Sequence, residues 1–162
     1  MRIAFVLLIV ILTGCSTNRM PTDASTALRN ATTLELFSLD PDMSDDPDMS
    51  DEKSNTTAFH GWEVLGSTEI TARQSRDSLL DALEAGIAEH DRSVALCFDP
   101  RHGIRVTYQE KQYDFVICFH CYQAMWYTDG VENEVFLLSR SPQPTFDKLL
   151  RDALVTLPAP AE

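Results

Sequence analysis

Apolar residues follow two periodicities along the chain, and these predict its strands and helices. Apolar runs, and apolar residues that alternate with polar ones, are typical of strands. They predict strands at residues 33–39, 59–70, 94–98, 104–108, 113–119, 123–127 and 135–138. We expect the first two of these strands to pair with each other.

Apolar residues spaced three and four apart predict two helices. The inner face of the first would comprise Leu79, Leu80, Leu83 and Ile87. Thr71 and Gln74 precede it as a capping-box pattern. The second would begin with Thr145 as its cap. Its inner face would comprise Phe146, Leu149, Leu150, Ala153 and Leu154.

The order of these elements predicts an α+β fold with a mostly antiparallel sheet flanked by two helices. Asp129 and Gly130 are a hairpin signal between the last strands. We expect one small domain at residues 32–157, followed by a free tail at residues 158–162.

The amino terminus has the pattern of an export signal. Arg2 is followed by a wholly apolar run at residues 3–12, and then by Thr13, Gly14 and Cys15. Ten residues of helix span about 15 Å, which is half of the hydrocarbon core of a bilayer, so this run is too short to cross it. The stretch Leu12-Thr13-Gly14-Cys15 resembles the lipobox of bacterial lipoproteins.

The lipobox resemblance implies that residues 1–14 are a signal peptide and that Cys15 carries acyl chains such as palmitate. Residues 15–31 would then be a lipidated tether, because they are mostly small and polar. Ser16 after the cysteine implies the outer membrane in a Gram-negative cell envelope. The alternative is an ordinary signal peptide in which Cys15 occurs by chance.

The chain is acidic, with a formal net charge of −12 at pH 7. Phosphate backbones repel such a protein, which excludes nucleic acid as an expected partner. The hexapeptide D-P-D-M-S-D occurs at residues 40–45 and again at residues 46–51. Residues 40–57 therefore predict a disordered acidic loop inside the domain. A calcium loop is the alternative, but the glycine turn and terminal glutamate are missing.

Three further cysteines, Cys97, Cys118 and Cys121, are expected to meet an oxidising compartment. In a simple meander Cys97 would lie two strands, or roughly 10 Å, from Cys118, too far for a disulfide. Cys118 and Cys121 could bridge only if their strand bends. Small buried cysteines with at most one bridge are the simplest interpretation, and no cofactor is then needed.

Zinc and thiol redox chemistry are the alternatives for the same cysteines. Zinc would use Cys97, Cys118 and Cys121 with either His102 or His120, because zinc takes four tetrahedral ligands. Redox motifs of the form C-x-x-C usually begin a helix, which lowers the thiol pKa. Here the following residues predict a strand.

A polar site is also possible on the sheet. Asp114, Cys118 and His120 alternate along one strand, and Arg105 lies on the neighbouring one. Cysteine, histidine and carboxylate together are the composition of a nucleophile site, as in a Cys-His hydrolase. The simpler interpretation is a cross-strand ion pair between Arg105 and Asp114. Arg101 is a further candidate for this polar site.

Residues 97–121 contain C-F-D-P-R-H-G and then D-F-V-I-C-F-H-C. This pattern resembles a group of uncharacterised bacterial proteins, which also share pieces like those at residues 35–41, 59–66 and 141–147. The resemblance implies one domain with the acidic repeat as an insertion. It implies no activity and no site residues.

Together these patterns predict a lipid-anchored envelope protein with a binding or interaction module for an unknown protein or small molecule. The first alternative is a zinc or thiol-redox protein. A Cys-His hydrolase ranks lowest.

Overall fold

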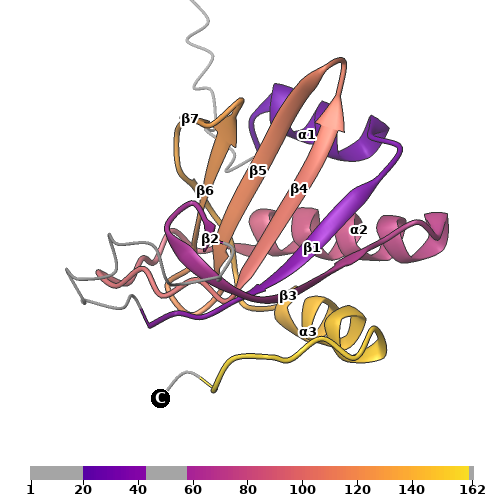
Figure 1. Ribbon diagram of the computed structural model, residues 1–162. Coiled ribbons are helices and arrows are strands. Elements are labelled where there is room, and N and C mark those ends of the chain that lie inside the picture. Colours follow the sequence, from indigo (N-terminus) through magenta and orange to yellow (C-terminus); the bar gives the residue numbers. More distant parts are fainter. Residues whose placement is uncertain (1–19, 43–57, 161–162) are drawn as a thin grey trace, which may run out of the picture.

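The computed structural model describes residues 20–42 and 58–160 (Figure 1). The signal peptide, Cys15 and most of the predicted acidic loop lie outside these residues. The helices and strands of the described residues are α1 (Thr22–Asn30), β1 (Leu34–Leu39), β2 (Ala58–Phe59), β3 (Trp62–Glu69), α2 (Arg73–Glu89), β4 (His102–Tyr108), β5 (Lys111–Cys118), β6 (Gln123–Thr128), β7 (Val131–Glu132), β8 (Phe136–Leu137) and α3 (Gln143–Asp152).

The strands form one antiparallel sheet in the order β2-β3-β1-β4-β5-β6-β7, and β8 pairs with β6. β1 pairs with β3 on one side and with β4 on the other. From β4 to β7 each strand pairs with the next one along the chain. The predicted α+β fold, the pairing of β1 with β3 and the hairpin at Asp129 are confirmed.

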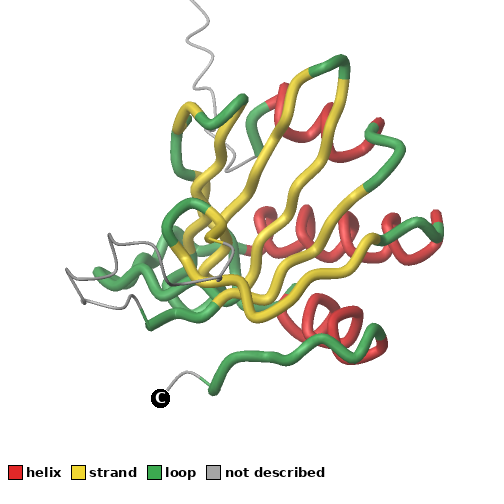
Figure 2. Tube along the Cα trace, viewed as in Figure 1, coloured by secondary structure: helices red, strands yellow, loops and turns green. Residues whose placement is uncertain are grey.

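The main core lies between the sheet and the helices, which cover one face of the sheet (Figure 2). Alternation along the strands sends every second side chain into this core. The strand residues buried here include Leu34, Leu36, Ile104, Val106, Phe115, Ile117 and Trp126. α2 contributes Leu79, Leu80, Leu83 and Ile87, as its spacing predicts. The predicted face of α3 is only partly correct, because Phe146 and Leu150 are buried but Leu154 is 94% exposed.

A second, smaller core lies on the opposite face of the sheet. Phe37, Leu39, Phe59 and Val116 form it. The β2–β3 hairpin curls over this face, and the rings of Phe37 and Phe59 stack with centroids 4.5 Å apart. Gly103 is required beneath Phe59, since a Cβ atom at that position would lie 2.8 Å from the Phe59 ring. The face left free by the helices is therefore partly covered by the protein itself.

The predicted tether is corrected, because residues 22–30 within it form α1. Ala24, Ala27 and Leu28 recur on one side of α1 and are buried in the main core. The sheet is thus flanked by three helices rather than two, and the domain begins before residue 32. The sequence pattern missed this helix, because its buried face comprises only Ala24, Ala27 and Leu28.

The prediction of a strand at residues 94–98 is wrong. This segment has no regular secondary structure, and Val94 and Leu96 are 53% and 105% exposed. Its apolar residues therefore do not mark a buried strand. The tail is also corrected, because the carbonyl of Ala159 accepts a hydrogen bond from Arg101 Nε at 3.0 Å.

Both predicted helix caps are wrong as well. α2 begins at Arg73 after Ala72, and α3 begins at Gln143 after Pro142, so neither Thr71 nor Thr145 is a cap. Within the described residues, no helix combines the length and apolar character needed to cross a bilayer.

Candidate thiol site

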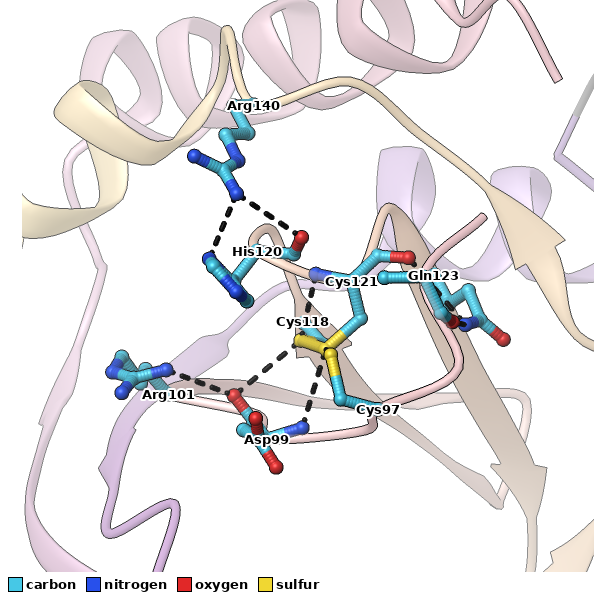
Figure 3. Close-up of a disulfide and its surroundings, with 9 residues drawn as sticks. Cys97, Asp99, Arg101, Cys118, His120, Cys121, Gln123 and Arg140 are labelled. Carbon is cyan, nitrogen blue, oxygen red and sulfur yellow. Dashed lines mark hydrogen bonds between the residues drawn. A yellow bond between two sulfur atoms is a disulfide. The ribbon is translucent and has the colours of Figure 1, made fainter. Parts of the chain in front are cut away.

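The cysteine site lies where β5 ends. Cys118 is the last residue of β5, and the chain then turns through residues 119–122, with Tyr122 at a φ of 61°. The turn returns Cys121 to within 5.2 Å of Cys118, Cα to Cα, and their sulfurs form a disulfide (Figure 3). The bend that this pairing requires is therefore present.

Cys97 lies against the disulfide as a free cysteine and belongs to the irregular segment before β4. Its Sγ lies 3.1 Å from the Sγ of Cys121. Two hydrogen bonds hold the segment there, because Ala95 N–H donates to the carbonyl of Cys121 and Gln123 Nε2 donates to the carbonyl of Ala95. The prediction from a simple meander misplaced Cys97, because this residue lies outside the sheet and contacts Cys121 in the turn at residues 119–122.

Backbone amides point at both sulfurs of the disulfide. The N–H of Cys121 donates to Cys118 Sγ at 3.0 Å, and the N–H of Asp99 donates to Cys121 Sγ at 3.3 Å. Hydrogen bonds to a charged group favour its charged form, so these donors would stabilise a thiolate on either sulfur. Cys118 and Cys121 are fully buried, whereas Cys97 is partly exposed.

The two histidines predicted as zinc ligands are engaged elsewhere. His102 is buried against α3, with Nε2 2.8 Å from Asp147 Oδ1, and its Nδ1 has no hydrogen-bond partner among residues 20–42 and 58–160. Burial lowers the pKa of His102, while the bond to Asp147 opposes this shift. His120 Nδ1 accepts from Arg140 Nη2 at 2.7 Å. Among the described residues, the group whose ligand atoms lie within 4.8 Å of one another is Cys97, Asp99 and Cys121.

The predicted polar site divides into two parts. Arg105 donates two hydrogen bonds to Asp114, at 2.8 and 2.7 Å, which confirms the cross-strand ion pair. Hydrogen bonding to Asp114 raises the pKa of Arg105, although its partial burial opposes this. His60 also contacts Asp114, at 2.8 Å, a partner that the strand pattern missed because it comes from the β2–β3 hairpin. Arg101 lies instead beside the cysteines, where Nη1 donates to the carbonyl of Asp99.

No protein-family model, no curated protein and no solved structure matches the chain. The lipobox and the resemblance to an uncharacterised bacterial group therefore stay predictions. The structure shows a cluster of three cysteines, in which the partly exposed thiol of Cys97 contacts the buried disulfide between Cys118 and Cys121.

Proposed function

We propose that the chain is a lipid-anchored protein of the cell envelope whose domain carries out thiol–disulfide exchange at Cys97, Cys118 and Cys121. The observation that carries the proposal is the 3.1 Å distance between Cys97 Sγ and Cys121 Sγ. Exchange requires a thiolate to reach a disulfide sulfur, and these two sulfurs are already in contact. This contact favours exchange over the binding module that the sequence pattern favours.

Different roles for the three sulfurs are proposed from their exposures, since Cys97 is partly exposed and Cys118 and Cys121 are buried. In the fully reduced protein, the Cys97 thiolate attacks an external disulfide, forms a mixed disulfide and releases one thiol. Cys121 then attacks Cys97 Sγ, which releases the second external thiol and leaves a Cys97–Cys121 bond. Finally, Cys118 attacks Cys121 Sγ and frees Cys97. Two protein thiols are oxidised and one external disulfide is reduced to two thiols.

Backbone N–H groups, rather than a helix amino terminus, donate to the two bridged sulfurs of this motif. A low-pKa thiol leaves faster in exchange. The amides of Cys121 and Asp99 donate to Cys118 Sγ and Cys121 Sγ, which are the nucleophiles of the last two steps and the leaving groups when the relay runs in reverse. The lack of a helix after this C-x-x-C therefore does not exclude exchange.

Disulfide mapping of the full chain tests the relay. Free thiols are blocked with N-ethylmaleimide, and the peptides are identified by mass spectrometry. In the wild type we expect a Cys118–Cys121 bridge and a blocked Cys97. In Cys118→Ser we expect a Cys97–Cys121 bridge instead, because these two sulfurs are in contact. The control Cys97→Ser should keep the Cys118–Cys121 bridge. Blocked Cys97 and Cys121 together in oxidised Cys118→Ser would contradict the relay.

The rate of exchange is measured with an uncharged probe, bis(2-hydroxyethyl) disulfide. We expect reduced Cys97→Ser to react at least about tenfold more slowly than the reduced wild type, since access to the attacking sulfur limits exchange. Equal rates for the two proteins would show that Cys97 is not the entry sulfur.

A metal centre at the same residues is the second candidate. Cys97, Asp99 and Cys121 already lie within coordinating reach of one ion, and reduced Cys118 would add a third thiolate. Metal analysis of the reduced full chain separates the two functions. One zinc per chain, lost in Asp99→Asn and in Cys97→Ser, would favour the metal centre over exchange.

A further inference from the structure

A small cavity of about 200 Å³ adjoins the cysteine site. Its lining includes Asp99, Arg101, His120 and Arg140. His120 lies between the two bridged cysteines in the sequence, and the amide of Asp99 contacts Cys121 Sγ. In Figure 3 the two arginines and His120 lie on one side of the disulfide, and Gln123 lies on the other. Asp99 therefore borders both the cavity and the cysteine site.

The two arginines of the cavity lining, Arg101 and Arg140, donate hydrogen bonds to neutral groups. Arg101 Nε and Nη1 donate to carbonyl groups, and Arg140 Nη2 donates to His120. Within residues 20–42 and 58–160, neither arginine forms an ion pair with a carboxylate. Arg29, Arg73, Arg105 and Arg151 each pair with an acid.

Asp99 is an acidic residue of the cavity lining. Among the described residues, no hydrogen bond or ion pair engages the side chain of Asp99, whose backbone atoms make its hydrogen bonds. Two guanidinium groups and one carboxylate around a small cavity complement a zwitterion, with its carboxylate on the arginines and its ammonium on Asp99. The volume suits a ligand no larger than an amino acid, since sites for drug-sized ligands begin at about 300 Å³.

We infer that this cavity binds the α-amino and α-carboxylate groups of a small amino-acid thiol or disulfide, of the class of cysteine and cystine. The inference rests on the proposed exchange function for its chemistry, and it adds the substrate class. The zwitterionic end of the ligand occupies the cavity, which places its sulfur beside the cysteine cluster.

Binding is tested without any redox step by using S-methylcysteine, which keeps both charged groups and has no thiol. Calorimetry with the full chain should detect S-methylcysteine and should show no binding of its methyl ester, whose carboxylate is blocked. Arg140→Gln should weaken the binding about tenfold, the cost of one lost charge-assisted contact. The matched control Arg73→Gln alters an exposed arginine on α2 and should bind as the wild type does.

Equal binding of acid and ester, no binding of the acid, or an unchanged affinity in Arg140→Gln would each overturn the inference. Kinetics separate it from the exchange proposal. If exchange occurs but the substrate class is wrong, bis(2-hydroxyethyl) disulfide reacts, and the KM for cystine is no lower than the KM for this probe. If exchange itself fails, neither disulfide reacts, and the S-methylcysteine result still decides whether the cavity is a zwitterion site.

Discussion

Asp114 is buried on the face of the sheet opposite the helices, with 1% of its surface exposed. Arg105, His60 and Gln112 surround its carboxylate, at 2.7 to 3.0 Å. The Arg105 guanidinium also lies over the rings of Phe37 and Phe59, at 5.7 and 5.1 Å. The carboxylate therefore connects the β2–β3 hairpin to the centre of the sheet.

Asp114→Asn should lower the free energy of unfolding by about 3 kcal/mol, since it leaves the partly buried Arg105 without its counter-charge. Urea unfolding followed by circular dichroism measures the loss. The matched control Asp77→Asn removes an exposed acid that pairs with Arg73 at 3.6 Å, and it should change the stability by less than about 0.5 kcal/mol. An Asp114→Asn midpoint equal to that of the wild type would show that the cluster contributes nothing to stability.

At the scale of residues, the sequence predicts pairs of contacting side chains, but not the third residue that contacts each pair. Arg105 and Asp114 follow from strand register, and the Cys118–Cys121 bridge follows once a bend is granted. Cys97 and His60 could not be placed, because the ranges that contain them were each predicted as a strand. Cys97 instead lies in an irregular segment, and His60 lies in the turn between β2 and β3. Their positions depend on tertiary packing.

Among the elements, α1 is where the local pattern was least informative. Its buried side chains are two alanines and Leu28, too few to give a clear helical periodicity. Tertiary contacts hold it in place. Arg29 pairs with Asp81 and Glu84 on α2, and Met20 packs against the main core. The helices with several leucines or large apolar residues were predicted, but their first residues were not, since neither N-cap uses a side-chain hydrogen bond.

Leu28→Ala distinguishes a docked helix from a tether. Leu28 is 3% exposed, so its truncation should cost about 2 to 3 kcal/mol of stability. Thr26→Ala, on the exposed side of α1, is the control and should have little effect. Thermal or urea unfolding of both variants provides the measurement. If Leu28→Ala is as stable as the wild type, α1 does not belong to the folded domain.

In the whole molecule, the two ends of the sheet have different neighbours. α1 lies behind the end where β4 joins β5, and Cys118 lies at the opposite end of β5 (Figure 1). β5 has eight residues, so these ends are about 25 Å apart. Since α1 begins at Thr22, residues 16–21 are all that would separate it from a lipid at Cys15. Six residues reach at most about 20 Å. An anchor at Cys15 would therefore hold the α1 end close to the bilayer and leave the cysteine end directed away from it.

The anchor itself is tested on the full chain in a Gram-negative host supplied with an alkyne analogue of palmitate. We expect the wild type to incorporate the label and to lose residues 1–14, because acylation at Cys15 precedes removal of the signal in lipoproteins. Cys15→Ala should remain unlabelled and uncut, whereas the control Cys97→Ser should be labelled like the wild type.

Two or more acyl chains make membrane release negligible, since each buried methylene contributes about 0.8 kcal/mol. Labelled protein should therefore sediment with membranes even in high salt, which removes proteins held by charge alone. An unmodified Met1 in the mass spectrum of soluble wild-type protein would contradict the anchor, and with it the oxidising surroundings that the exchange at Cys97 requires.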